Sequence, residues 1–334
     1  GARAVDLPTY AFQRQRYWPA ATSTRTGDVR FAGLGAAGHP LLGAAVELAG
    51  GEGTDGVVLT GRLSTQSHPW LADHVVQGAV LVPGTALLEL AVRAADEVGC
   101  DTVEELTLST PLVLPDRGGI QIQVRVGVPD EDGRCSLAVH ARTEDDSHGP
   151  WTVHATGALA RGTTPATGFD ASVWPPRDAA PVDVTDCYER LAEAGFAYGP
   201  TFQGLRAAWR RGDDLFAEIA LEDGTDGGAF GLHPALFDAA LHAFAIDDEG
   251  RGGVPFSWEG VRLHASGASA LRVRLTRDAD GAMALELADT AGAPVASVES
   301  LTVRPLATGE LDLTGRDSLF RVEWVSARVA EAGA

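Results

Sequence analysis

The sequence HPWLADHVVQGAVLVPGTALLEL, which runs from His68 to Leu90, places a histidine, a glycine and a helix start in one short apolar stretch. His74 is followed four residues later by Gly78, and Pro83 comes five residues after that glycine. Apolar residues then recur at helical spacing as far as Val98, where a glycine suits the helix end. Proline is favoured in the first helical turn, because the N–H that it lacks would have no partner there. The stretch therefore predicts a helix over residues 84–98, preceded by a loop that carries His74.

His74 and Gly78 suit proton abstraction from a carbon next to a carbonyl. A neutral imidazole, whose ordinary pKa is about 6.5, can accept such a proton. Gly78 has no side chain, so its N–H can approach a ligand near the positive end of the following helix. A lone histidine beside a turn glycine is more often part of a core, so this interpretation depends on a second site farther along.

Composition excludes several classes of function. The net charge of −20 argues against binding nucleic acid or an anionic membrane. No run approaches the roughly 18 apolar residues of a membrane-spanning helix. The three cysteines are scattered without a CxxC pair, which indicates neither a disulfide framework nor a zinc site. We therefore expect a globular protein of the reducing cytoplasm, with no signal peptide and no metal.

The chain repeats one order of elements: strand, loop, single helix, then a run of antiparallel strands. Such a repeat indicates an internal duplication, and a curved antiparallel sheet buries the apolar stripe of one helix well. The sequence thus predicts an α+β fold. Strands are expected at 42–48, 57–63, 106–113, 120–128, 137–141 and 151–158 around the first helix, and at 215–221, 261–264, 271–275, 284–287 and 295–303 around a second helix, His233–Ala245.

Residues 33–38 match the GxGxxG pattern of dinucleotide-binding folds. That pattern functions only between a buried strand and a helix that opens on it. Pro40 follows at once and favours an extended conformation at residue 39. We therefore reject a dinucleotide site.

The second helix supplies a partner for His74. Asp238 and His242 are four residues apart, so they share one side of this helix among small and apolar neighbours. An exposed pair at this spacing is the simpler interpretation. Burial would instead raise the pKa of Asp238 above about 3.9, so that it holds a proton and can donate it. A base and an acid with opposite tasks would then come from the two halves of the chain.

Four motifs together resemble the dehydratase domains of bacterial modular type I polyketide synthases. The resemblance covers residues 38–306, and its only departures are Ala197 for glycine and Val254 for leucine, both small and apolar. The matching segments are HxxxGxxxxP (His74, Gly78, Pro83), DxxxQ/H (Asp238, His242), GYGPxF (Tyr198, Gly199, Pro200, Phe202) and LPFxW (Pro255, Phe256, Trp258).

This resemblance implies a double hot-dog fold, in which two antiparallel sheets each wrap around one long helix. It also implies the loss of water from a β-hydroxyacyl thioester carried on the phosphopantetheine arm of an acyl carrier protein. His74 would take the α-proton, Asp238 would protonate the departing hydroxyl, and the Gly78 N–H would bind the thioester oxygen. Tyr198 and His242 would position the hydroxyl, and no metal or organic cofactor would be needed. The implied division is 1–37 a linker of the type that follows an acyltransferase, 38–160 the first unit, 161–182 a linker, 183–306 the second unit, and 307–334 a linker and the start of a ketoreductase region.

The resemblance further implies a homodimer with neighbouring acyltransferase and ketoreductase domains. Rival interpretations remain: a double-bond isomerase or cyclase of the same fold, a catalytically silent scaffold, or a hot-dog thioesterase. The presence of both His74 and Asp238 favours dehydration over these, and no GxSxG segment supports a serine hydrolase. Tyr198, Phe202 and Trp258 suit a tunnel lining and a plain core equally, whereas His68 and His233, each followed by proline, suit structural roles.

Overall fold

The computed structural model describes residues 29–49, 55–146, 149–162, 169–246, 253–278 and 281–305. Residues 1–28 of the predicted linker 1–37 and the whole predicted segment 307–334 lie outside these residues.

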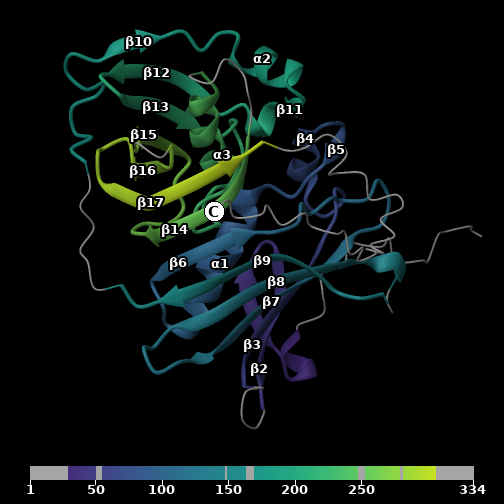
Figure 1. Cartoon of the computed structure of the whole chain (residues 1–334). Coiled ribbons are helices and arrows are strands. Elements are labelled where there is room, and N and C mark those ends of the chain that lie inside the picture. The colour runs from purple at the N-terminus through teal and green to yellow at the C-terminus, as the bar shows by residue number, and fades with distance from the viewer. Residues whose placement is uncertain are drawn as a thin grey trace, which may run out of the picture.

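One antiparallel sheet of 14 strands runs through both halves of the molecule (Figure 1). The halves meet where β6 pairs with β14, with Val103 opposite Val261. In spatial order the strands of the first half are β1 (Gly35–His39), β2 (Leu42–Leu48), β3 (Gly56–Leu63), β7 (Ile120–Pro129), β8 (Cys135–Thr143), β9 (Thr152–Ala160) and β6 (Thr102–Leu108). Those of the second half are β14 (Val254–Leu263), β17 (Pro294–Arg304), β16 (Met283–Ala288), β15 (Ala270–Arg277), β13 (Asp214–Ala220), β12 (Leu205–Arg211) and β10 (Ala180–Val182).

The order of the strands confirms the predicted duplication. Counted outward from the β6–β14 junction, the first half reads β9, β8, β7, β3, β2, β1, and the second reads β17, β16, β15, β13, β12, β10. Each strand thus has a counterpart at the same position in the other half. The chain therefore has the double hot-dog fold that its motifs imply.

Each half has one central helix, α1 (Gly84–Val98) in the first and α3 (Pro234–His242) in the second. Helix α1 keeps its apolar stripe buried, and it ends where Gly99 takes a left-handed conformation with φ of 71°. The two helices contact each other, and α1 also lies against β6 and β14 (Figure 1). The ends of both helices are thereby brought to the seam between the halves.

Some predicted elements differ from the structure. The strand expected at 106–113 is instead β6, Thr102–Leu108, because Pro111 interrupts the apolar run and residue 113 only bridges to Leu81. The second helix ends at His242 and continues as a short 3-10 turn, Ala243–Ile246. The strand β1 begins inside the segment assigned to a linker and leads to a turn, not a helix, which is consistent with rejecting a dinucleotide site. The short helix α2 (Cys187–Glu193), the strand β11 (Phe196–Tyr198) and β12 were not predicted at all.

Candidate active site

His74 opens a short strand that joins the two halves. After the 3-10 turn η2 (Pro69–Asp73), β4 (His74–Val76) pairs on one side with β5 (Ala79–Val80) and on the other with β11. This second sheet places His74 directly opposite Tyr198 of the other half, with ring centroids 5.4 Å apart. The strand that carries the histidine is therefore fixed by the segment that carries the tyrosine.

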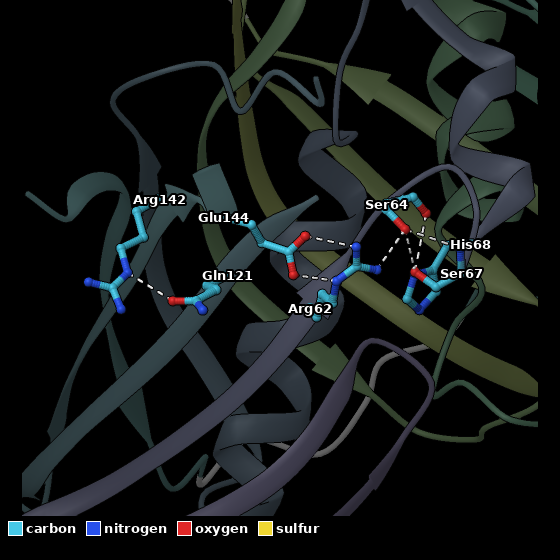
Figure 2. A network of polar contacts seen from close by, with 7 residues as sticks. All are labelled: Arg62, Ser64, Ser67, His68, Gln121, Arg142 and Glu144. Atoms are coloured by element: carbon cyan, nitrogen blue, oxygen red, sulfur yellow. Dashed lines mark hydrogen bonds and ion pairs between the residues drawn. The ribbon is translucent and has the colours of Figure 1, made fainter. Parts of the chain in front are cut away.

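A directed chain of hydrogen bonds holds the loop that leads to β4 (Figure 2). The carbonyl of Pro40 can only accept, so His68 donates to it through Nε2 at 3.0 Å and accepts at Nδ1 from Ser67, 2.9 Å away. Ser64 in turn lies 2.9 Å from the Ser67 hydroxyl and accepts from Arg62 at 3.0 Å. This network is consistent with a structural role for His68.

Asp73 connects the His74 loop to the Tyr198 segment. One of its carboxylate oxygens accepts from the backbone N–H of Thr201 at 3.1 Å and from the hydroxyl of the same residue at 2.6 Å. The N–H of Gly199 donates to the backbone carbonyl of Asp73 at 2.7 Å. A Cβ at Gly199 would overlap this carboxylate, so glycine lets the segment approach Asp73 closely. The segment from Tyr198 to Thr201 thus positions the loop that carries His74.

The tautomer of His74 follows from its partner. Its Nδ1 lies 3.0 Å from the carbonyl oxygen of Leu81, which can only accept, so Nδ1 carries the proton and Nε2 has a free lone pair. The side chain is buried, and burial lowers the pKa of His74 below 6.5, although the charge of Asp238 opposes this. A neutral imidazole with Nε2 exposed to the site has the properties of a general base.

Asp238 faces that lone pair from helix α3. Its Oδ2 lies 3.7 Å from Nε2 of His74 and 3.0 Å from Nε2 of His242. Burial is the largest influence on the pKa of Asp238 and raises it, but the hydrogen bond from His242 and the electrostatic attraction of both histidines outweigh burial and leave the pKa lowered. The predicted burial is thus present, whereas the predicted rise in pKa is wrong because His242 donates to the carboxylate.

A mainly apolar cavity opens onto this group, and side chains of both halves line it. Five of the residues that the motifs single out belong to its wall: His74, Tyr198, Asp238, His242 and Pro255. Aliphatic residues such as Leu81, Leu112, Leu241 and Met283 supply most of the remainder.

The other motif residues lie around this wall without forming it. Phe202 and Trp258 are fully buried: Phe202 lies behind the His74 ring with centroids 5.0 Å apart, and Trp258 packs against Phe237. Both are core residues of the described structure. Pro83 caps helix α1, Pro200 begins a 3-10 turn, and Phe256 lies against the guanidinium of Arg304.

Gly78 does not lie at the cavity. It occupies the exposed turn between β4 and β5, where both Gln77 and Gly78 have positive φ, 48° and 80°. The assignment of Gly78 as the donor to a thioester oxygen therefore does not fit the structure. Glycine at this position instead allows the positive φ that the turn requires. Gly84, the first residue of α1, does line the cavity.

The N-terminus of α1 has backbone N–H groups that the helix itself does not use. Its first intrahelical bonds run from Ala86 and Leu87 to the carbonyl of Pro83, so the N–H groups of Gly84 and Thr85 precede the helical ladder. Helix N-termini favour negative charge. A Cβ at Gly84 would lie 2.9 Å from Leu108 Cδ1 and 3.3 Å from the Pro255 ring, so glycine keeps this part of the cavity open.

Sequence reasoning missed a buried carboxylate between the helices. Glu89 of α1 is 4% exposed and accepts from the N–H groups of Gly231 and Leu232 at 2.7 and 3.0 Å. It also contacts Nε2 of His39 at 3.1 Å. The signal in the sequence is a charged residue within the apolar run of α1. One turn earlier, the hydroxyl of Thr85 donates to the Pro234 carbonyl at 3.1 Å. Together these contacts hold the start of α3 against α1.

Within the described ranges, no group of three His, Cys, Asp or Glu side chains is arranged to hold a metal ion. None of the described helices is long and apolar enough to cross a membrane.

Comparison with known proteins points to one family. A model described as "Polyketide synthase dehydratase domain" matches residues 39–142, and one described as "Polyketide synthase dehydratase N-terminal domain" matches residues 166–312. Polyketide synthase GfsA of Streptomyces halstedii is 57% identical over 348 residues, and Pikromycin polyketide synthase component PikAII of Streptomyces venezuelae is 50% identical over 331 residues. The chain is covered to 100% and 96% in these alignments but spans only 5% and 9% of those proteins.

Solved structures agree with the sequence relatives. The dehydratase domain from the terminal module of the rifamycin polyketide synthase is 47% identical with a TM-score of 0.78, and the match covers 83% of this chain and 100% of that one. The erythromycin dehydratase is 45% identical with a TM-score of 0.76 and the same coverage. A bifunctional dehydratase-cyclase domain from ambruticin biosynthesis is 46% identical with a TM-score of 0.75, covering 80% of this chain and 96% of that domain. The chain therefore belongs to the dehydratase domains of polyketide synthases.

Proposed function

We propose that this domain removes water from a β-hydroxyacyl thioester held on the phosphopantetheine arm of an acyl carrier protein, with His74 as base and Asp238 as acid. The observation that carries the proposal is the approach of His74 Nε2 to Asp238 Oδ2, 3.7 Å across the wall of an apolar cavity. The two groups come from different halves of the fold, and each is buried.

The reaction balances with these two side chains. The lone pair on His74 Nε2 takes the proton from Cα, the C–H electrons form the Cα=Cβ bond, and the Cβ–O bond breaks as Asp238 protonates the departing oxygen. The products are an α,β-unsaturated thioester, water, an imidazolium and a carboxylate. Transfer of the proton from His74 back to Asp238 then restores the starting state, so one proton serves both groups.

Bound substrate is expected to populate the acid form of Asp238. Its two histidine neighbours lower the pKa of this carboxyl in the open cavity, while burial raises it. An acyl chain in the cavity removes the remaining water and so strengthens the effect of burial, which favours the protonated form. The substrate hydroxyl also enters the space next to Oδ2, where it can accept the proton.

The neighbouring groups have supporting roles in this scheme. The N–H of Gly84 replaces Gly78 as the donor to the thioester oxygen, where negative charge develops as the α-proton leaves. Tyr198 positions the hydroxyl as a neutral phenol, since burial and the charge of Asp238 raise its pKa well above 10. Arg277 and Arg304, which also line the cavity, supply positive charge that suits the phosphate of the carrier arm. The scheme uses no metal and no organic cofactor.

The setting of the domain is part of the proposal. The relatives are polyketide synthases of which this chain spans a small part, which supports an acyl carrier protein and neighbouring acyltransferase and ketoreductase domains as partners. A homodimer and a cytoplasmic location, expected from the resemblance and the composition, belong to the same proposal.

Mass spectrometry of a β-hydroxyacyl thioester incubated with the domain tests the reaction. Wild type is expected to remove one water, and His74→Ala and Asp238→Asn are expected to abolish that loss. His264→Ala is the matched control, because this histidine contacts Ser297 and is not part of the cavity wall. Unchanged substrate mass with wild type, over a series of chain lengths and hydroxyl configurations, would refute dehydration.

Cyclisation is the second candidate, because a relative 46% identical to this chain is a bifunctional dehydratase-cyclase. A cyclised product has the same mass as the unsaturated thioester but lacks its conjugated double bond. Ultraviolet absorbance of the purified product separates the two outcomes when the substrate carries a second hydroxyl.

A further inference from the structure

Tyr188 of helix α2 lies behind the acid and has no part in the scheme above. Its hydroxyl accepts from the backbone N–H of Leu205 at 2.8 Å and lies 3.4 Å from Nδ1 of His242. The two rings meet edge to face, with centroids 5.6 Å apart. Tyr188, His242 and Asp238 thus form a continuous polar path from the backbone of β12 to the carboxylate.

The direction of each hydrogen bond in this path follows from its two ends. A backbone N–H can only donate, so the Tyr188 oxygen accepts from Leu205 and retains its own O–H to donate. Burial raises the pKa of Tyr188 well above its usual range, so this O–H is present throughout the neutral range. The acceptor within reach is Nδ1 of His242.

At the other end, Asp238 requires a donor. When Asp238 is a carboxylate, its Oδ2 accepts from Nε2 of His242, 3.0 Å away, so Nε2 carries a proton. A ring with its proton on Nε2 and a lone pair on Nδ1 satisfies both ends. The opposite tautomer would leave both the carboxylate and the tyrosine O–H without this partner.

Packing prevents the His242 ring from turning over and exchanging the positions of its two nitrogens. The side chain is 4% exposed, and the ring of Tyr198 lies 4.2 Å from it, centroid to centroid. His242 is the last residue of α3, and its carbonyl accepts from the thiol of Cys187, the neighbour of Tyr188, at 3.9 Å. Helix α2 is therefore fixed to the end of α3 at this point.

We propose that Tyr188 is a positioning residue for the acid: its hydroxyl donates to Nδ1 of His242 and so fixes the ring with its proton on Nε2, facing Asp238. The opposite tautomer would turn a lone pair towards Asp238 and leave the carboxylate without the donor that holds it in place. The proposal rests on the proposed acid role of Asp238.

Nitrogen NMR of the domain labelled with ¹⁵N-histidine tests the tautomer directly. In wild type, the proton of the His242 ring is expected on Nε2, with Nδ1 as an acceptor. Tyr188→Phe keeps the ring and removes the hydroxyl, so the Nδ1–H form of His242 is expected to appear. A wild-type Nδ1–H form, or an unchanged tautomer in Tyr188→Phe, would overturn the proposal.

Kinetics distinguish positioning from mere support of the fold. Tyr188→Phe is expected to lower kcat about tenfold, as for loss of one hydrogen bond, with KM within about twofold of wild type. In a His242→Gln background, where there is no imidazole tautomer to fix, the same substitution is expected to change kcat by less than about twofold. An equal loss in both backgrounds would show a structural role only.

The two proposals fail separately. The tautomer is measured without turnover, so an inactive wild type with an Nε2–H His242 would refute dehydration and leave the hydrogen-bond path intact.

Discussion

Replacing Gly84 with alanine tests which glycine binds the thioester oxygen. The new Cβ would meet the end of the flexible Leu108 side chain at 2.9 Å and the Pro255 ring at 3.3 Å, so the fold can accept it with a small shift of Leu108. Alanine is also a better helix former than glycine by up to about 1 kcal/mol. The stability of the domain is therefore expected to change little.

Activity is expected to change much more, because the methyl group enters the part of the cavity that the helix N-terminus faces. Displacing the carbonyl from its donor removes about 3–4 kcal/mol of transition-state stabilisation, which corresponds to a loss of 10²–10³-fold in kcat/KM. Gly78→Ala is the matched control with the opposite expectation. Its φ of 80° costs a non-glycine residue about 1–2 kcal/mol, but a Cβ there meets nothing within 4 Å.

The assay measures the initial rate of double-bond formation on a β-hydroxyacyl pantetheine thioester, with thermal unfolding in parallel. Gly84→Ala should lose activity and keep its midpoint, whereas Gly78→Ala should keep kcat/KM and unfold a few degrees lower. If Gly84→Ala remained within about tenfold of wild type while Gly78→Ala lost activity, the assignment of the donor to the start of α1 would be refuted.

Four further predictions follow from other contacts. Glu89→Ala leaves the donors of the segment before α3 unpaired and should cost about 2–4 kcal/mol in chemical denaturation; a loss below about 1 kcal/mol would contradict the proposed joint. Burial lowers the pKa of His233 to about 4 from 6.5, so the unfolded chain binds this proton at a higher pH than the folded chain does. The free energy of unfolding should therefore fall by up to roughly 3 kcal/mol as the pH decreases from 6.5 to 4. The fall should be less steep in His233→Asn, because asparagine can cap the helix but does not titrate. Asp73→Ala removes two hydrogen bonds to Thr201 and should lower the free energy of unfolding by about 2 kcal/mol. An unchanged free energy of unfolding would contradict the link between the two loops. Because burial lowers the pKa of His74, the acidic limb of the kcat/KM profile should lie below pH 6.5, and a limb above 6.5 would argue against His74 as the base.

The fold was largely predictable because its strongest signals are periodic. The strand from Ile120 alternates without a break, and α1 matches the residues predicted for it at both ends. The predicted strand 106–113 lies too far along the chain, because the apolar residues of β6 continue into the loop that contains Pro111. The sequence does not predict α2 or β11 because each is too short to show a period, although Tyr198, the last residue of β11, begins a recognisable motif.

The site was predictable in its members and not in its electrostatics. Burial of Asp238 follows from its apolar neighbours, but the direction of its pKa depends on the 3.0 Å contact with His242, which spacing alone does not establish. The misassignment of Gly78 has a similar cause. Both Gly78 and Gly84 lie near the start of the helix in sequence, and only the hairpin turn at residues 77–78 shows that the first points to solvent.

The two halves match in the order of their strands on either side of the β6–β14 junction, but they use their central helices differently. In each half the central helix carries one buried carboxylate, Glu89 on α1 and Asp238 on α3. Asp238 faces His74 at the cavity. Glu89 instead accepts from two backbone N–H groups of the second half and contacts His39. One carboxylate therefore faces a cavity, whereas the other joins the two halves.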